Sequence, residues 1–271
     1  MRGVSRTSLA QGHERLASIL ARPGVDGAAV SEDLFSVADV FDEQISLRRA
    51  LTDPSADEER KSALVTGLFG GKIGDPALEE VVQLASSRWS SGRDLSDATE
   101  ELAVQAAVTL ADQQGYLDDL EDDLFRFGRI VGSQPELRSF LGDPAIPGER
   151  KAELIGRLVE GKVRPVTVRL IDRAVIAPRG RSLDRALEDY AKIAADHRQR
   201  MIAVVRVAVD MTDAQRTRLA DILRRMHGRE VHLNIVLDPT VQGGISVQVG
   251  DEVIDGTITT RLDQARRQIA G

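Results

Sequence analysis

Cysteine is absent from this sequence of 271 residues, which excludes disulfides, zinc ribbons, iron–sulfur clusters and thiol nucleophiles. Aromatic residues are scarce, with six Phe, two Tyr and one Trp, so Leu, Val, Ile and Ala must fill the core. The longest apolar stretch, residues 202–209, is interrupted by Arg206, and the first residues lack the apolar segment of a signal peptide. We therefore expect neither a membrane span nor an export signal.

An excess of basic residues is missing as well. The sequence has 36 Lys and Arg against 43 Asp and Glu, a net charge of -7. This balance argues against a protein that neutralises a phosphate backbone. The arginines at 224, 225 and 229 have no aromatic neighbours on which bases could stack, so we expect no nucleic-acid partner.

Lysine is the scarcest charged residue, and its few positions reveal a duplication. Four of the five lysines form two pairs, Lys61 and Lys72 in the first and Lys151 and Lys162 in the second, separated by 90 residues. At this shift, residues 34–72 match residues 124–162 at 15 of 39 positions without a gap. Ordinary composition would give roughly two or three matches. The sequence therefore contains an internal repeat.

Each repeat reads as helical over about 90 residues. Residues 61–69 and 151–159 carry apolar side chains at one-sided helical spacing, and Pro76 and Pro165 stand where the next helix begins. The second of these helices must stop before Pro178. Residues 95–114 end the first repeat and also open the second repeat. They open the second repeat because Ala107, Leu110 and Ala111 match residues near the start of the first, namely Ala17, Leu20 and Ala21. We predict one helix that both repeats share.

The periodicity changes after about residue 198. Val205, Val207 and Val209 alternate as in a strand, and Thr212 with Gln215 forms a capping box for a helix that ends at Gly228. Two more strands, 231–237 and 245–249, and a terminal helix over 258–269 follow. The predicted fold is mainly α with a small α/β C-terminal domain: two tandem helical bundles, 1–102 and 103–197, then a βαββα-type module over 198–271.

No pattern for chemistry emerges from the sequence. The segment Gly70-Gly71-Lys72 lacks the earlier glycine and the hydroxyl of a phosphate-binding loop, and is typical of a helix end. The four histidines lie on different predicted elements, and the acidic run at 118–123 is typical of a solvated face or a contact with a basic partner. We therefore predict no catalytic residues, no cofactor and no metal.

Seven residues of the C-terminal segment follow one another in the order Asp238, Gly243, Gly244, Ile245, Val247, Gly250 and Asp255. This order resembles the signature of the delta subunit of F-type ATP synthases, called the oligomycin-sensitivity-conferring protein in mitochondria. Residues 103–197 are similar to that family's six-helix bundle, through the Asp143-Pro144 pair, Lys151 and the turn at 179–183. Thr257 departs from the family's usual serine, and the first repeat has no counterpart in short family members, so the chain resembles the long actinobacterial form.

The resemblance implies a stator protein without an active site. It would link the N-terminal helix of an alpha subunit in the catalytic head to the C-terminal end of the b stalk. The protein would then be peripheral to the cytoplasmic face of the bacterial plasma membrane, held there only through the complex. By the same resemblance, the alpha-subunit helix lies between the first and fifth helices of the second repeat. The matching residues are Ala107, Leu110, Ala111, Leu170, Ile171, Ala174 and Val175.

Several alternatives stay open at the level of sequence. The seven interface residues also suit a plain helical core. The chain would also fit a generic helical adaptor unrelated to the synthase, although the order of residues at 237–262 disfavours this, and an acidic metal-independent enzyme is a third reading. We expect the second repeat to hold the alpha subunit because it adjoins the C-terminal domain, and the first to contact the stalk or a neighbouring subunit.

Overall fold

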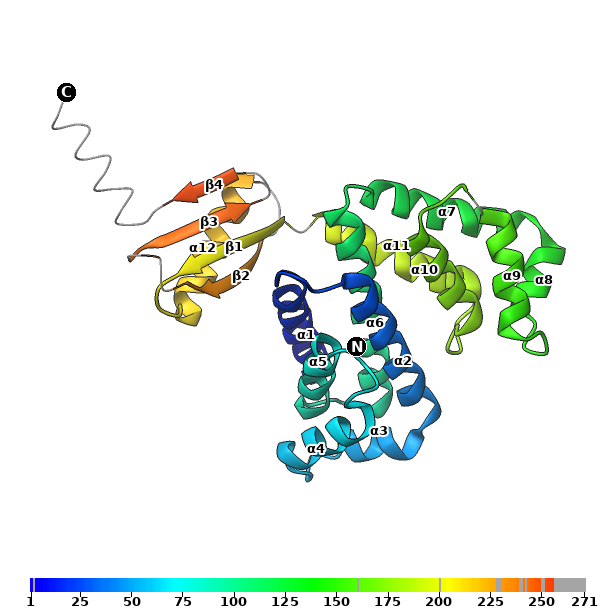
Figure 1. Cartoon of the computed structure of the whole chain (residues 1–271), viewed down its shortest axis with the longest axis horizontal. Coiled ribbons are helices and arrows are strands. Elements are labelled where there is room, and N and C mark those ends of the chain that lie inside the picture. The colour runs from blue at the N-terminus through cyan, green and yellow to red at the C-terminus, as the bar shows by residue number, and fades with distance from the viewer. Residues whose placement is uncertain are drawn as a thin grey trace. The chain divides into compact units, whose positions relative to one another are not determined.

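The computed structural model describes residues 1, 3–159, 161–199, 201–227, 231–238, 241, 243–249 and 252–255. Within these residues the chain is mainly helical, with a small mixed sheet near the C-terminus (Figure 1). It divides into two compact units, Met1–Ala195 and Asp196–Gly271. Each unit is described by itself below.

The duplication of the sequence is also a duplication of helices. Four helices of the first repeat have counterparts whose first and last residues lie 90 positions later. The paired helices are α2 (Gly27–Glu43) and α7 (Leu117–Ser133), α3 (Ile45–Thr52) and α8 (Pro135–Gly142), α4 (Glu58–Phe69) and α9 (Gly148–Val159), and α5 (Asp75–Ser86) and α10 (Pro165–Ile176). The remaining helices of this part are α1 (Val4–Leu20), α6 (Gly92–Gln113) and α11 (Leu183–Gln199).

Residues that match between the repeats build the same helix ends. The guanidinium of Arg48 donates to the carbonyls of Phe41 and Asp42 at the end of α2, each at 2.7 Å. Arg138 donates to the carbonyl of Gly132 at the end of α7, 3.0 Å away. Each arginine satisfies carbonyls that have no partner within their own helix. This explains why the arginine is retained in both copies.

The matched Asp-Pro pairs and glycines also have local roles. Asp53 and Asp143 each accept a hydrogen bond from the backbone N–H two residues further on, at 2.8 Å in both repeats. Gly71 and Gly161 follow α4 and α9 with φ of 71° and 67°, a left-handed conformation that glycine adopts without steric cost. The prediction that Gly70-Gly71-Lys72 ends a helix is confirmed.

Helix α6 connects the repeats without interruption. It runs from Gly92 to Gln113, and its N-cap Ser91 accepts a hydrogen bond from the N–H of Asp94. It contacts α1, α2 and α3 of the first repeat and α7 and α10 of the second. The predicted shared helix is therefore confirmed, although it begins three residues earlier than residue 95. The predicted boundary at 102 and 103 falls inside it.

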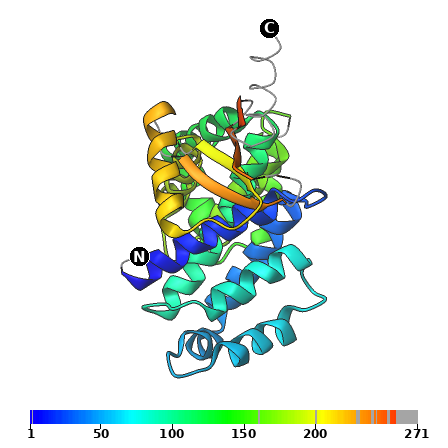
Figure 2. The same ribbon diagram turned by 90° about the vertical axis from the view of Figure 1, so that its left-hand side faces the viewer.

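The two repeats also share one apolar core. Buried side chains of both repeats form a single cluster, in which the rings of Phe41 and Phe69 meet edge to face at 6.0 Å. Helix α1 contacts both α5 and α6 and closes the first repeat (Figure 2). Small residues along α6, such as Ala103, let α2 approach closely, and Ser31 donates to the Ala103 carbonyl at 2.8 Å.

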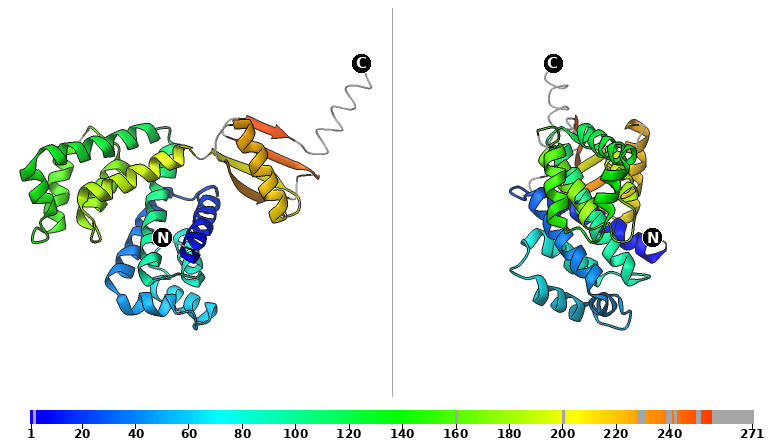
Figure 3. Two further views of the ribbon diagram at one scale, coloured as in Figure 1. Left: turned by 180° about the vertical axis from the view of Figure 1, so that it is seen from behind. Right: turned by 90° about the vertical axis from the view of Figure 1, so that its right-hand side faces the viewer.

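The second unit is a mixed sheet with one helix. It contains β1 (Met201–Val207), α12 (Asp213–His227), β2 (Val231–Leu237), β3 (Ile245–Val249) and β4 (Glu252–Asp255). The strand order is β2-β1-β3-β4, with β1 and β2 parallel and the other pairs antiparallel. Helix α12 lies against one face of this sheet (Figure 3).

Several sequence predictions for this unit are confirmed, and others need correction. The capping box forms as predicted: the N–H of Gln215 donates to Thr212 Oγ1, and Gln215 Oε1 accepts from the N–H of Thr212. The predicted strand included Val209, but strand β1 ends at Val207 and Val209 is 79% exposed. The predicted strand was therefore two residues too long. Strand β4 was not predicted, since its four residues are too few to show a period. The predicted terminal helix lies outside the described residues.

Candidate functional site

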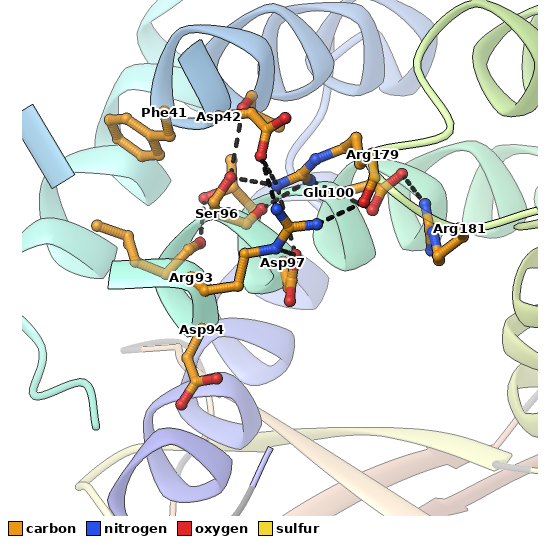
Figure 4. A network of polar contacts seen from close by, with 12 residues as sticks. Phe41, Asp42, Arg93, Asp94, Ser96, Asp97, Glu100, Arg179 and Arg181 are labelled. Atoms are coloured by element: carbon orange, nitrogen blue, oxygen red, sulfur yellow. Dashed lines mark hydrogen bonds and ion pairs between the residues drawn. The ribbon is translucent and has the colours of Figure 1, made fainter. Parts of the chain in front are cut away.

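A network of charged side chains lies where the two repeats meet (Figure 4). At its centre is Arg179, on the loop between α10 and α11, with a side chain only 3% exposed. One guanidinium nitrogen donates to the Ser96 carbonyl at 3.1 Å and to Glu100 at 3.3 Å. The other contacts the Ser96 hydroxyl, Asp42 at 3.3 Å and Asp97 at 3.4 Å. One loop of the second repeat is thus attached to α2 and α6.

The backbone of this loop is held in an unusual conformation. Arg179 has a φ of 54°, in the left-handed region, and the next residue, Gly180, has a φ of 78°. An L-residue pays about 1–2 kcal/mol there because its Cβ crowds the following carbonyl. The Arg179 carbonyl accepts a 2.6 Å hydrogen bond from Arg93 on α6, which holds the backbone of the loop as well. The contacts of the side chain compensate the local strain.

Glu100 is the second centre of the network. Its carboxylate accepts hydrogen bonds from Arg181 at 2.6 Å and from the Tyr190 hydroxyl at 2.7 Å, in addition to Arg179. Burial raises the pKa of Tyr190 above its ordinary value, so the phenol keeps its proton and remains a donor. Arg93 and Arg181 match between the two repeats at a shift of 88 residues, two fewer than upstream, and both end in this network.

A further set of contacts joins α2 to α10. Arg169 pairs with Glu32 at 2.5 Å, and Arg173 pairs with Asp39 at 2.6 Å. The guanidinium of Arg173 also lies over the ring of Phe35, 4.6 Å from its centre. Glu32, Asp39 and Asp42 form an acidic stripe along α2, and each of these residues contacts an arginine of the second repeat. We refer to the contacts of Arg169, Arg173, Arg179 and Arg181 collectively as the repeat junction.

The repeat junction holds helices together rather than positioning reactive groups. Its cations and carboxylates are paired with one another, and Asp97, whose pKa is raised by burial, still faces Arg93 and Arg179. Removing one partner of a buried ion pair typically costs about 3–5 kcal/mol, because the other charge stays buried without compensation. This arrangement favours one rigid body in place of two loosely connected bundles.

The residues predicted for the alpha-subunit interface lie close together, but mostly in the core. Leu110 is partly buried, and the others are at most 5% exposed. Leu110 itself lies under Gly27 at the start of α2, where an added Cβ would be 3.5 Å from the Leu110 Cβ. The buried residues of the predicted set are Ala107, Ala111, Leu170, Ile171, Ala174 and Val175.

The predicted signature residues build the turn from β2 to β3. The N–H of Asp238 donates to the Val207 carbonyl at 2.9 Å, and Gly243 and Gly244 have φ of 72° and 82°. Ile245 begins β3 and Val247 is buried in its centre, while Asp255 ends β4 opposite Ser246. Gly250 lies outside the described residues. Both glycines are thus in the left-handed region, which glycine adopts without steric cost, and these residues shape the sheet.

Other sequence candidates form no site among the described residues. The acidic run at 118–123 lies on α7 with its carboxylates largely at the surface, while Leu120 and Leu124 point into the core. Within the described ranges, no three His, Asp or Glu side chains are grouped so that they could hold a metal ion. No helix in this part of the chain is long and apolar enough to cross a bilayer.

The repeat junction was not predicted from the sequence, although the two repeats differ in charge at residues that form it. These charges are present in only one repeat: Asp42 corresponds to Gly132, and Arg173 corresponds to Gln83. Such a difference alone does not identify a contact, because many exposed charges also occur in one repeat only. Arg179 appeared only as part of a turn, because nothing local in the sequence places it beside Asp42.

These features define a mainly helical protein with a duplicated module, whose buried charges join its parts. A family model described as ATP synthase delta (OSCP) subunit matches residues 104–269. The chain is similar to the ATP synthase subunit delta of Streptomyces griseus, with 49% identity over 100% of both chains. It is 48% identical to that of Kineococcus radiotolerans, over 99% of this chain and 98% of the relative. The chain therefore belongs to the ATP synthase delta (OSCP) subunit family.

Among solved structures, the chain is similar to one in the mitochondrial ATP synthase hexamer of Toxoplasma gondii. The identity is 20% and the TM-score 0.29, over 62% of this chain and 95% of the other. This likeness is too distant to support an argument about the present fold.

Proposed function

We propose that this chain is the stator link of an F-type ATP synthase, joining the catalytic head to the membrane-anchored stalk. The observation that carries the proposal is the family match, which spans the second repeat and the C-terminal unit, together with relatives that are similar over their whole length. Such a link prevents the head from turning with the rotor and does no bond chemistry itself. Its place is the cytoplasmic face of the bacterial plasma membrane, where it is held by the complex.

The second repeat, in this proposal, holds the N-terminal helix of an alpha subunit along α6 and α10. Six of the seven residues implied by the family are buried, so they support the surface, and Leu110 is the member that a partner can reach. Helix α2 of the first repeat lies beside this surface through Gly27. The partner helix would therefore meet both repeats at once.

The C-terminal unit, with its turn of Asp238, Gly243 and Gly244, is proposed to hold the end of the b stalk. Two attachments, one on the helical unit and one on the C-terminal unit, suit a part that resists torque. A nanomolar contact corresponds to about 12 kcal/mol, and simultaneous attachment at several sites raises the effective affinity without new contacts.

Deletion and restoration of the chain in its own organism test this function. We expect the deletion to leave ATP hydrolysis by the detached head intact and to abolish proton-driven ATP synthesis in membrane vesicles. Addition of the purified chain should restore synthesis. If synthesis driven by a proton gradient survives the deletion, the chain is not a stator link.

Crosslinking tests which repeat holds the alpha subunit. A photoreactive residue in the alpha N-terminus should capture the second repeat, and replacing Leu110 by Asp should reduce the yield about tenfold, a loss of about 1.4 kcal/mol. The equivalent replacement in the first repeat, Leu20→Asp, is the comparison, with circular dichroism to verify folding. Capture by the first repeat alone would reverse the assignment.

A further inference from the structure

The first repeat carries an open apolar groove between α2, α3 and α4. Its volume is about 690 Å³, and its walls include Val40, Leu47, Ala50, Leu64 and Leu68. Leu64 is 38% exposed, although it belongs to the apolar stripe of α4. Val65 and Phe69 form the half of that stripe that enters the core, so Leu64 and Leu68 are available at the surface.

The second repeat provides an internal comparison for this groove. Leu47, Leu64 and Leu68 correspond to identical leucines, whereas Val65 and Phe69 beneath them have become Ile155 and Val159. Three leucines of the wall are thus the same in both repeats, whereas Phe69, which also lines the groove, is not. Ala50 is different: its counterpart is Phe140, a partly buried side chain that is far larger. The open volume at Ala50 therefore belongs to the first repeat.

A single charge, Lys72, stands at the groove. No carboxylate is among the lining residues. The backbone N–H of Lys72 donates to the Phe69 carbonyl at 2.9 Å, but its side-chain ammonium makes no hydrogen bond or ion pair with any residue that the structure describes. Its counterpart Lys162 instead donates to the Leu158 carbonyl at 2.9 Å, as expected of a lysine at a helix end. In a chain with net charge -7, an unpaired ammonium beside apolar side chains is a place for a carboxylate.

We propose that this groove binds an amphipathic helix of another subunit of the same synthase, with a carboxylate of that helix against Lys72. Helices bind such grooves through apolar side chains at positions i, i+3, i+4 and i+7. The inference rests on the proposed function, because it takes the partner from the synthase, and it gives the first repeat a contact of its own.

Two crosslinks in the purified synthase test the proposal. A photoreactive residue replaces Ser46, an exposed position on the rim, and a carbodiimide joins the Lys72 amine to any carboxylate in contact with it. Both reactions should capture the same helical segment of one other subunit. Lys72→Arg keeps the charge but forms no such amide, so this variant should lose only the carbodiimide product.

Filling the groove gives the decisive comparison. Ala50→Phe, which copies the second repeat, should reduce both crosslinks at least tenfold, whereas Ala63→Phe adds the same ring at an exposed site on α4 outside the groove and should change neither. The proposal is wrong if the two reactions capture different segments, if only lipid or a small molecule is captured, or if Ala50→Phe has no effect. A chain that remains in the synthase without these crosslinks overturns this inference alone. A chain that never copurifies with the synthase overturns the proposed function as well.

Discussion

Glu80 on α5 is a buried carboxylate in a helical core. Its counterpart in the second repeat is Leu170, and its single described partner is Arg15, 3.2 Å away. One carboxylate oxygen, Oε2, is buried with no hydrogen-bond partner among the described residues. Burial raises the pKa of Glu80 to about 7, and the charge of Arg15 opposes this only in part.

This pKa makes stability depend on pH with a definite sign. Below about pH 4.5, Glu80 is protonated in both the folded and the unfolded chain, so it adds no pH dependence to the free energy of unfolding. Between about pH 4.5 and pH 7, Glu80 ionises in the unfolded chain but not yet in the folded one. The folded chain therefore loses stability as the pH rises through this range. The full loss is roughly 3 kcal/mol. We expect Glu80→Gln to unfold like the parent at pH 4.5 and to be more stable at pH 8, measured by urea denaturation.

The neighbouring Glu79 gives the control. Arg22 lowers its pKa by a hydrogen bond at the surface, so Glu79→Gln should show no such gain at pH 8. If the parent and Glu80→Gln differ equally at both pH values, the pKa of Glu80 is not raised in the folded chain.

Arg179 allows contact energy and backbone strain to be separated. Arg179→Ala should lower the free energy of unfolding by about 3 kcal/mol, since it leaves carboxylates of the repeat junction without their cation. Arg179→Gly loses the same contacts but relieves the left-handed backbone, and should be about 1 kcal/mol more stable than the alanine variant.

Denaturant titration measures both variants of Arg179. Arg185→Ala, which removes exposed ion pairs on α11, should cost less than about 1 kcal/mol. Equal stability of the alanine and glycine variants would show that no strain is stored at this loop.

At the scale of the element, α1 depends on close contact with its neighbours. A Cβ at Gly12 would lie 3.0 Å from a methyl of Leu102, 3.2 Å from Glu80 Oε1 and 3.3 Å from a methyl of Leu84. Gly12→Ala should therefore destabilise the chain by about 1 kcal/mol despite the better helix propensity of alanine.

Gly67→Ala on α4 meets no atom within 4 Å, and should raise thermal stability by about 0.5–1 kcal/mol. Stabilisation by both substitutions would contradict the packing of α1.

The elements also show what the sequence could predict. Helix ends followed from local chemistry: the Asp-Pro pairs, the glycines after α4 and α9 and the Thr212 box all act within a few residues. Strand β4 has too few residues for a visible period, and Val253 on it is 58% exposed. The repeat junction depends on pairs such as Arg179 and Asp42, 137 positions apart, which only the fold brings together.

At the scale of the whole molecule, the shared helix predicts cooperative unfolding of residues 1–195. Trp89, the single tryptophan, reports on the first repeat, and a fluorophore on Ser139→Cys reports on the second, since the chain has no other thiol. Both signals should change at the same denaturant concentration, because neither repeat can keep its core without α6. A label on Thr217→Cys in α12 reports on the separate C-terminal unit.

Two separate transitions for Trp89 and Ser139→Cys would show that the repeats are independent. Ala103→Pro, in the middle of α6, provides the converse test. Both signals should then change at a lower denaturant concentration than in the parent, since proline breaks the helix that the repeats have in common.

The continuity of α6 has a consequence for how a gene of this kind changes length. Because α1 and the second half of α6 open their repeats at equivalent positions, a chain that joins Leu20 directly to Ala111 still enters α7 through a complete first helix. Removal or gain of one 90-residue unit thus needs no new linker and leaves no unpaired helix. A single recombination between the two copies can convert a long form into a short one, or the reverse, and each product keeps a closed bundle.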